Sequence, residues 1–200
     1  MSDGFTFYFD FSSPYGYLAA QRVDAVAARQ GREVVWRPML LGAVFKRIGG
    51  QPLVEIPMKG DYARHDIPRS ARLLGVPFVF PPSFPFASIA AARAVYWLDA
   101  QDPAAARALA KAIYQAAFGL GQDILSAERV IAIAAGLGHD PDSVAAALQA
   151  PEVKERLRQE VEDAIALGVF GSPFFLVDGE PFWGNDRLAE VERWLETGGW

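Results

Sequence analysis

The stretch FTFYFDFSSPYGYL at residues 5–18 decides the fold. Phenylalanine occupies every second position of its first half, and a period of two is typical of a β-strand, here with apolar residues on both faces. Its second half places Ser13 directly before Pro14. Serine followed by proline suits a helix N-cap and first residue, because proline lacks only an N–H that the first turn leaves unpaired. We therefore expect a buried strand followed by a helix that starts at Pro14 and runs to Gly31.

The segments on either side extend this unit. Residues 33–38, EVVWRP, predict a second strand, and one helix between two strands predicts a βαβ unit with a parallel pair. Near the other end, the apolar run at 173–177 and a short strand at 180–183 flank Asp178 and Gly179, a strong hairpin signal. Both termini of the chain thus contribute strands.

A last helix follows the hairpin. We expect Asn185 or Asp186 to cap it. Its inner face is formed by residues at helical spacing, which are Leu188, Val191, Trp194 and Leu195.

The middle of the chain divides into an irregular and a helical part. Residues 40–85 are rich in glycine and proline and predict loops with one short helix at 67–74. Residues 87–168 predict four helices, with caps at Asp102, Ser126 and Asp140. The order is therefore βαβ, a helical block, then ββα. No linker separates these pieces, so we expect one α/β domain over residues 1–200 with the helical block inserted.

Composition excludes several classes of function. The formal charge is −5, which argues against a broad surface for nucleic acid or an anionic membrane. No apolar run approaches the roughly 20 residues that span a bilayer, and no signal peptide is visible, so we expect a cytoplasmic protein. The chain has no cysteine, so any sulfur chemistry must come from a ligand. Its two histidines, His65 and His139, show no metal-binding spacing, and we expect no metal site.

Three motifs carry a resemblance to a known family. They are FDFSSPYGYL at 9–18, GVFGSPFF at 168–175 and FWGNDRL at 182–188. Together they resemble the 2-hydroxychromene-2-carboxylate isomerases, which are similar to the kappa-class glutathione transferases. The resemblance covers nearly the whole chain and implies a DsbA-like thioredoxin fold. Residues 1–45 and 169–200 would form the thioredoxin-like part and residues 46–168 a mainly helical insertion.

Ser13 is the catalytic residue that the resemblance implies. Thioredoxin-like oxidoreductases carry a nucleophilic cysteine at this position before the proline, whereas a serine hydroxyl can only donate a hydrogen bond to the thiolate of bound glutathione. Such a bond contributes roughly 1.5–3 kcal/mol and a helix N-terminus roughly 0.3–2 kcal/mol. At about 1.4 kcal/mol per unit, the pKa of the thiol would fall by about one to three units. On helix chemistry alone, the favoured alternative is that Ser13 is only the N-cap of its helix. Ser12 is expected to be structural or to support Ser13 without contacting the ligand.

The resemblance also implies the glutathione-binding residues. Ser172 precedes Pro173 at the position where thioredoxin folds hold a cis-proline, and its backbone would pair with the cysteinyl part of glutathione. An ordinary proline at the start of an edge strand is the alternative. Trp183, Gly184, Asn185 and Asp186 would contact the γ-glutamyl end, with the Asp186 carboxylate near its ammonium group, although capping alone also explains Asn185 and Asp186.

Basic residues after the second strand are candidates for the organic substrate. In the resembled family a basic residue in this loop meets the substrate carboxylate, and Lys46 matches best, with Arg47 beside it. A solvated charge pair explains both nearly as well. The family often has an asparagine close by, where this chain has Gly49, Gly50 and then Gln51, so Gln51 is a candidate replacement. Aromatic residues between 78 and 86 would wall an apolar pocket or belong to the core.

The resemblance implies a glutathione-dependent isomerase that interconverts 2-hydroxychromene-2-carboxylate and trans-o-hydroxybenzylidenepyruvate in aromatic hydrocarbon degradation. Its partners would be glutathione, a small aromatic carboxylate and, by family resemblance, a second copy of the chain. A kappa-like transferase or peroxidase needs the same thiolate site but consumes glutathione. A non-catalytic glutathione- or peptide-binding module is the third reading.

Overall fold

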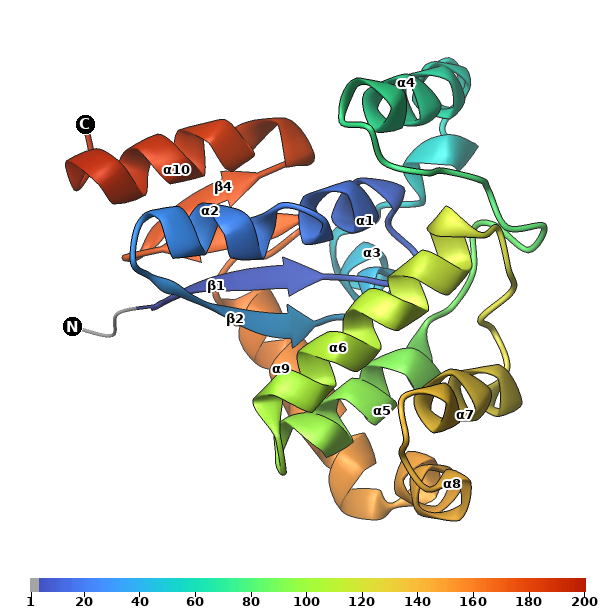
Figure 1. The fold of residues 1–200 in the computed structure, drawn as a ribbon. Helices are drawn as coiled ribbons and strands as arrows, with labels where there is room; N and C mark the ends of the chain where they lie inside the picture. Colours follow the sequence, from blue (N-terminus) through green and yellow to red (C-terminus); the bar gives the residue numbers. More distant parts are fainter. Residues whose placement is uncertain (1–3) are drawn as a thin grey trace.

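A four-stranded mixed sheet forms the centre of the protein (Figure 1). The computed structural model describes residues 4–200, so residues 1–3, on which the expectation about a signal peptide partly rests, lie outside it. The strands are β1 (Gly4–Phe9), β2 (Glu33–Pro38), β3 (Phe174–Val177) and β4 (Glu180–Trp183). Their order across the sheet is β2-β1-β3-β4.

The strand pairing confirms both predicted units. β1 and β2 are parallel over their whole length, as the βαβ unit requires. β3 runs antiparallel to β1 and joins β4 through a tight turn. Asp178 and Gly179 both have positive φ, 52° and 92°, which is the backbone of the two-residue hairpin that the sequence predicts. The two ends of the chain therefore close one sheet.

Helices fill the rest of the chain and cover both faces of the sheet. They are α1 (Pro14–Ala20), α2 (Val23–Arg29), α3 (Leu41–Ile48), η1 (Leu53–Glu55), α4 (Lys59–Leu73), α5 (Ile89–Asp99), α6 (Pro103–Tyr114), the π-helical turn η2 (Gln115–Gly119), α7 (Ala127–Gly136), α8 (Pro141–Gln149), α9 (Pro151–Ala166), η3 (Asn185–Arg187) and α10 (Leu188–Thr197). In Figure 1, α2 and α10 lie above the sheet and α9 below it.

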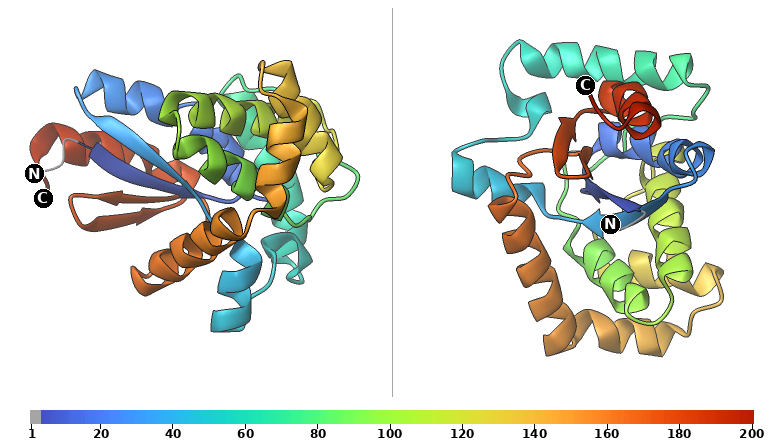
Figure 2. Two further views of the ribbon diagram at one scale, coloured as in Figure 1. Left: turned by 90° about the horizontal axis from the view of Figure 1, so that it is seen from below. Right: turned by 90° about the vertical axis from the view of Figure 1, so that its left-hand side faces the viewer.

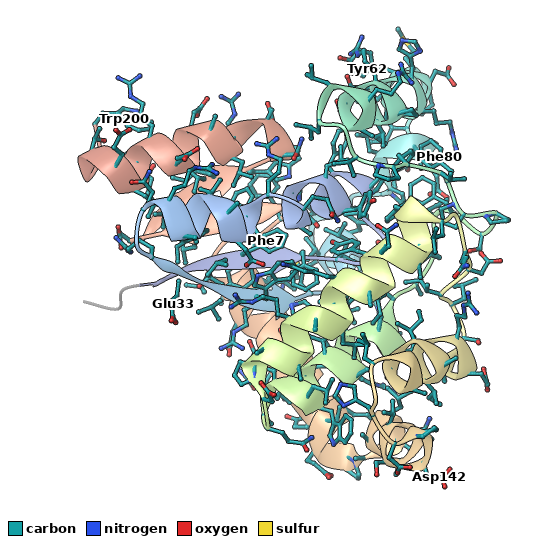
Figure 3. The ribbon with its side chains drawn as sticks, in the orientation of Figure 1. Phe7, Glu33, Tyr62, Phe80, Asp142 and Trp200 are labelled. Carbon is teal, nitrogen blue, oxygen red and sulfur yellow. The ribbon has the colours of Figure 1, made fainter. Side chains whose placement is uncertain are left out.

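The two faces of β1 bury different clusters. Phe7 lies at the centre of the molecule in Figure 3 and contacts Trp36 and Phe175 on the neighbouring strands. Tyr8 points to the other face and packs with Ala164 of α9. The alternation that predicted the strand thus reflects two buried faces, because both sides of β1 are covered.

The segment after β2 is more helical than the sequence predicts. In place of loops with one helix at 67–74, it contains α3 and the long helix α4. Pro68 sits inside α4, well after its first residue. The true inner face of α4 begins earlier and follows helical spacing at Gly60, Ala63, Ile67 and Ala71. Tertiary packing maintains the helix through the proline.

Two further expectations about helices are wrong. The helix expected from Pro14 to Gly31 is two seven-residue helices, α1 and α2, and the sequence between them contains no glycine or proline to signal the break. The four helices expected at 87–168 are the five α-helices α5 to α9.

The caps at Asp102, Ser126 and Asp140 are confirmed, since each side chain accepts a backbone N–H of its helix. The division of the domain at residues 45/46 stays a prediction; residue 46 lies within α3.

Candidate active site

A cavity of about 1430 Å³ opens at the C-terminal end of β1. Its walls come from the β1–α1 turn, α3, the segment 51–59, α4, residues 84–89 and the loops at 170–173 and 183–187. The right-hand view of Figure 2 shows α4 and α8 at opposite ends of the molecule, and α4 is the one that lines the cavity. Single-ligand pockets have volumes of about 300–1,000 Å³, so this cavity has room for two small molecules.

Ser13 lies on the wall of this cavity and is 5% exposed. As predicted, it is the N-cap of α1, and its Oγ accepts the backbone N–H of Gly16 at 3.0 Å. The same hydroxyl donates to the backbone carbonyl of Ser172 at 2.8 Å. The hydroxyl proton is thus already engaged, and the residues expected to share one ligand are in direct contact.

The Ser172–Pro173 peptide bond is cis, as the sequence comparison with thioredoxin folds predicts. Ser172 is also held from its side chain, because its Oγ accepts the backbone N–H of Asp10 at 3.0 Å. Both Ser172 and Pro173 line the cavity. The proline loop and the start of α1 therefore form one continuous hydrogen-bonded surface.

Gly16 allows this close approach. A Cβ atom at Gly16 would lie 2.5 Å from Tyr114 Oη and 2.9 Å from Ser172 Oγ. Tyr114 is fully buried and donates its hydroxyl to the backbone carbonyl of Asp10 at 2.9 Å. Burial and the nearby Asp10 raise the pKa of the Tyr114 phenol well above its usual value, so it acts as a neutral donor beneath the site.

The loop after β4 reaches the same cavity. The backbone N–H of Gly184 donates to Pro173 O at 3.0 Å, and Gly184 has φ 116°, which only glycine adopts readily. Trp183 lines the cavity and packs edge-on against Phe170. The expected capping role is wrong, because neither Asn185 nor Asp186 makes a side-chain cap to α10, which is preceded by η3.

Asn185 and Asp186 differ in their surroundings. Asn185 is buried and lines the cavity, and its side-chain Oδ1 has no hydrogen-bond partner. A buried carbonyl without a partner is uncommon in proteins and fits a missing donor. Asp186 also lines the cavity, but 79% of its side chain is exposed.

The residues predicted to bind the substrate do not all reach the cavity. Lys46 in the last turn of α3 and Gln51 both line the cavity, whereas the neighbouring Arg47 is not among the lining residues. The structure therefore does not bring Arg47 to the site, because the expected loop is a helix and adjacent helical residues point apart. A signal for α3 was present: two basic residues are followed by Gly49, which ends the helix with φ 74°.

The comparisons with known proteins agree with this geometry. A family model described as a DSBA-like thioredoxin domain matches residues 5–196. A 2-hydroxychromene-2-carboxylate isomerase from Sphingobium xenophagum is 32% identical over 197 residues, which are 98% of this chain and 99% of that one. The chain belongs to the 2-hydroxychromene-2-carboxylate isomerase family.

The chain is also similar to a solved isomerase structure and to a kappa-class transferase. A solved structure of a 2-hydroxychromene-2-carboxylate isomerase has a TM-score of 0.87 at 31% identity and covers 96% of this chain and 94% of its own. Glutathione S-transferase kappa 2 of Caenorhabditis elegans is 26% identical over 203 residues, with 94% of this chain and 90% of its own covered. The family and the DsbA-like fold expected from the three motifs are thus confirmed. Among residues 4–200, no helix combines the length and apolar character needed to cross a membrane.

In this isomerase-family chain the sequence reasoning missed three cavity residues. Lys59 begins α4 and supplies a second lysine to the cavity. Tyr15 donates its hydroxyl to Asp66 Oδ2 at 2.7 Å, and both line the cavity. Burial and the hydrogen bond to Asp66 raise the pKa of Tyr15. Although burial opposes it, the hydrogen bonds from Tyr15 and Arg69 lower the pKa of Asp66. Tyr15 follows the Ser13–Pro14 pair directly, and this was the available signal.

The aromatic residues expected to wall a pocket serve both the cavity and the core. Phe84 and Phe86 line the cavity, together with apolar residues of α3 and of the segment 51–59. Phe86 also belongs to the buried core, and the half-buried Phe78 packs on that core by stacking on Phe118. Both interpretations of this segment therefore hold, and Phe86 fits both.

Proposed function

We propose that this protein is a glutathione-dependent isomerase that interconverts 2-hydroxychromene-2-carboxylate and trans-o-hydroxybenzylidenepyruvate. The observation that carries the proposal is the contact between Ser13 Oγ and Ser172 O at the wall of a cavity large enough for two ligands. The isomerases that are about 32% identical along nearly their full length support the reaction. The kappa transferase relative supports glutathione as the second ligand.

The residues present fit glutathione. Asn185 Oδ1 is a buried acceptor without a partner, and Ser172, held before the cis-proline Pro173, offers its backbone in the same cavity. We assign glutathione binding to Ser13, Ser172, Pro173, Trp183, Gly184, Asn185 and Asp186. When bound, glutathione would supply a thiolate that adds conjugately to the substrate and leaves again after the former double bond has rotated.

Ser13 would act by donating a hydrogen bond from its hydroxyl to that thiolate. To do so the hydroxyl must turn away from Ser172 O, because a serine hydroxyl has one proton. A hydrogen bond to a charged acceptor contributes roughly 1.5–3 kcal/mol and a neutral one roughly 0.5–1.5 kcal/mol, so the exchange favours the thiolate by about 1–1.5 kcal/mol. This lowers the thiol pKa by about one unit. The helix α1 has only seven residues, so we attribute the effect to the hydroxyl.

Lys46 binds the carboxylate of the organic substrate. The cavity also contains Glu55, Asp66 and Asp186, and a cation is needed to hold an anionic substrate among them. Lys46 is carried by α3, whose Val44 is anchored in the core with Ala164 and Tyr8. Pairing with Lys46 would hold the substrate in one orientation, which makes the reaction effectively unimolecular. Gln51 is a polar neighbour for the same ligand.

The second candidate is a kappa-like glutathione transferase, which the Caenorhabditis elegans relative favours. It would use the same Ser13 site but release a glutathione conjugate. We further propose a cytoplasmic location and a homodimer. Light scattering of the purified protein tests the homodimer.

The experiment is an assay of the chromene carboxylate in both directions, with and without glutathione, while total free thiol is followed. The isomerase reading predicts turnover only with glutathione and a constant thiol concentration. Loss of one thiol per product formed would instead establish the transferase. No conversion under either condition would reject both activities for this substrate.

A further inference from the structure

Asp10 is a buried carboxylate at the cavity that the proposed reaction does not use. It is 3% exposed and follows β1 directly. Its Oδ1 accepts the backbone N–H of Ser12 at 2.8 Å and the hydroxyl of Ser88 at 2.7 Å. Its Oδ2 accepts the backbone N–H of Leu41 at 2.6 Å. Three segments far apart in sequence thus meet on one side chain.

Each of these segments is the start of a helix. Ser12 precedes the N-cap of α1, Leu41 is the first residue of α3, and Ser88 is the N-cap of α5. The N-caps of α3 and α5, Leu40 and Ser88, make no side-chain cap bond within their own helices. The Leu41 N–H is one of the donors that a helix start leaves unpaired, and Asp10 satisfies it from a different part of the chain.

We infer that Asp10 is a positioning residue that fixes the start of α3 against the Ser13 turn and thereby sets Lys46 relative to Ser13. The inference about Lys46 rests on the proposed function, whereas the attachment of α3 does not. α3 has eight residues, so its first and last turns move together, and Leu41 and Lys46 both line the cavity. Ser12 is covalently bonded to Ser13, so the Asp10 carboxylate holds both the turn that carries Ser13 and the helix that carries Lys46.

Direct catalysis by Asp10 is the less suitable reading. Both carboxylate oxygens are occupied by donors, and a negative charge near the thiolate would raise the thiol pKa rather than lower it. Burial raises the pKa of Asp10 itself, while the bonds from Ser12, Ser88 and Leu41 oppose this rise. The side chain therefore serves as an acceptor for three helix starts.

The test removes one of these bonds at a time. Leu41→Pro deletes the N–H that Asp10 accepts, yet proline suits the first position of a helix, so the intrinsic stability of α3 is retained. Leu41→Ala is the matched control, because it shortens the same side chain and keeps the N–H. Asp10→Asn is a second variant: its amide cannot accept from both Ser12 and Leu41, so either arrangement leaves one backbone donor unpaired. Asp102→Asn, at the start of α6 and outside the cavity lining, controls for the substitution itself.

The first readout is hydrogen exchange of fragments that cover residues 41–48, which needs no activity. We expect exchange of α3 to be faster by about tenfold or more in Leu41→Pro than in Leu41→Ala, with α6 to α8 unchanged. Equal protection of α3 in the two Leu41 variants, or in Asp10→Asn and Asp102→Asn, would overturn the inference.

The second readout is a double-mutant cycle with Lys46→Met, using KM for the chromene carboxylate. If Asp10 acts through Lys46, Leu41→Pro should raise KM severalfold in the wild-type background and add nothing in Lys46→Met. Additive effects would refute the link to Lys46. If Lys46→Met leaves KM unchanged, the substrate assignment in the proposed function is wrong, and the exchange experiment still decides whether Asp10 holds α3.

Discussion

Replacement of Ser13 by alanine is the most informative single change to the site. The variant loses two hydrogen bonds of one hydroxyl. Ser13 Oγ no longer accepts the backbone N–H of Gly16, and it no longer donates to the backbone carbonyl of Ser172. The lost cap costs about 0.5–2 kcal/mol, and the lost bond to Ser172 O costs about 0.5–1.5 kcal/mol, because Ser172 is only half-buried and lines the cavity. We therefore expect the free energy of unfolding to fall by about 1–3.5 kcal/mol, measured by denaturant titration.

The effect on catalysis should depend on pH. With Ser13 present, the pKa of the bound thiol is lowered by about one unit from roughly 8.5, so thiolate is present at neutral pH. Without Ser13 the pKa returns to roughly 8.5. Below both values the thiolate fraction, and with it kcat, should fall roughly tenfold, and above both values the two enzymes should converge. Ultraviolet titration of the bound thiol and the pH profile of kcat measure the same shift.

Ser126→Ala is the matched control, because Ser126 also caps a helix, accepting Arg129 N–H at 3.2 Å, outside the cavity lining. It should lose about 0.5–2 kcal/mol of stability and keep the wild-type pH profile. Ser12→Ala should be milder than Ser13→Ala. A Ser13→Ala profile with an unshifted inflection, or equal losses of activity in Ser13→Ala and Ser12→Ala, would show that Ser13 does not lower the thiol pKa.

Three further outcomes follow from the site. Lys46→Met should raise KM for the chromene carboxylate and leave glutathione affinity, measured by calorimetry, unchanged. The lost substrate binding should be about 2–5 kcal/mol if the lysine–carboxylate pair is desolvated and below about 1 kcal/mol if it is solvent-exposed. Arg47→Met, one residue away and outside the cavity lining, should change neither KM nor glutathione affinity. Asn185→Leu should weaken glutathione binding with little loss of thermal stability, because Asn185 Oδ1 has no partner in the protein; an unchanged dissociation constant would count against its role. Gly16→Ala should cost about 1–3 kcal/mol by thermal unfolding, since its Cβ would press on Tyr114 and Ser172; a variant as stable as wild type would contradict the packing at the site.

The parts that local sequence signals describe were predictable. The alternating phenylalanines fixed β1, the Ser13–Pro14 pair fixed the start of α1, and Asp178–Gly179 fixed the hairpin, because each is a short-range preference of the backbone. The cis bond before Pro173 came from the resemblance. Ser13 and Ser172, 159 residues apart, were expected to meet for the same reason.

The parts that depend on long-range packing were not predictable. α4 continues through Pro68 with a buried inner face at Gly60, Ala63, Ile67 and Ala71, and no local rule favours a helix through proline. α3 lacks a cap of its own and receives one from Asp10, so its start carries no local signal. With α3 read as a loop, only the family resemblance favoured Lys46 over Arg47, and nothing drew attention to Lys59.

The proposed mechanism requires a free glutathione thiol held at Ser13. Turnover of the chromene carboxylate with glutathione and with S-methylglutathione, at concentrations where calorimetry shows both to be bound, tests this requirement. We expect isomerisation with glutathione, none with S-methylglutathione, and competitive inhibition of glutathione-dependent turnover by S-methylglutathione. Equal isomerisation with the methylated compound would show that the thiol is not needed.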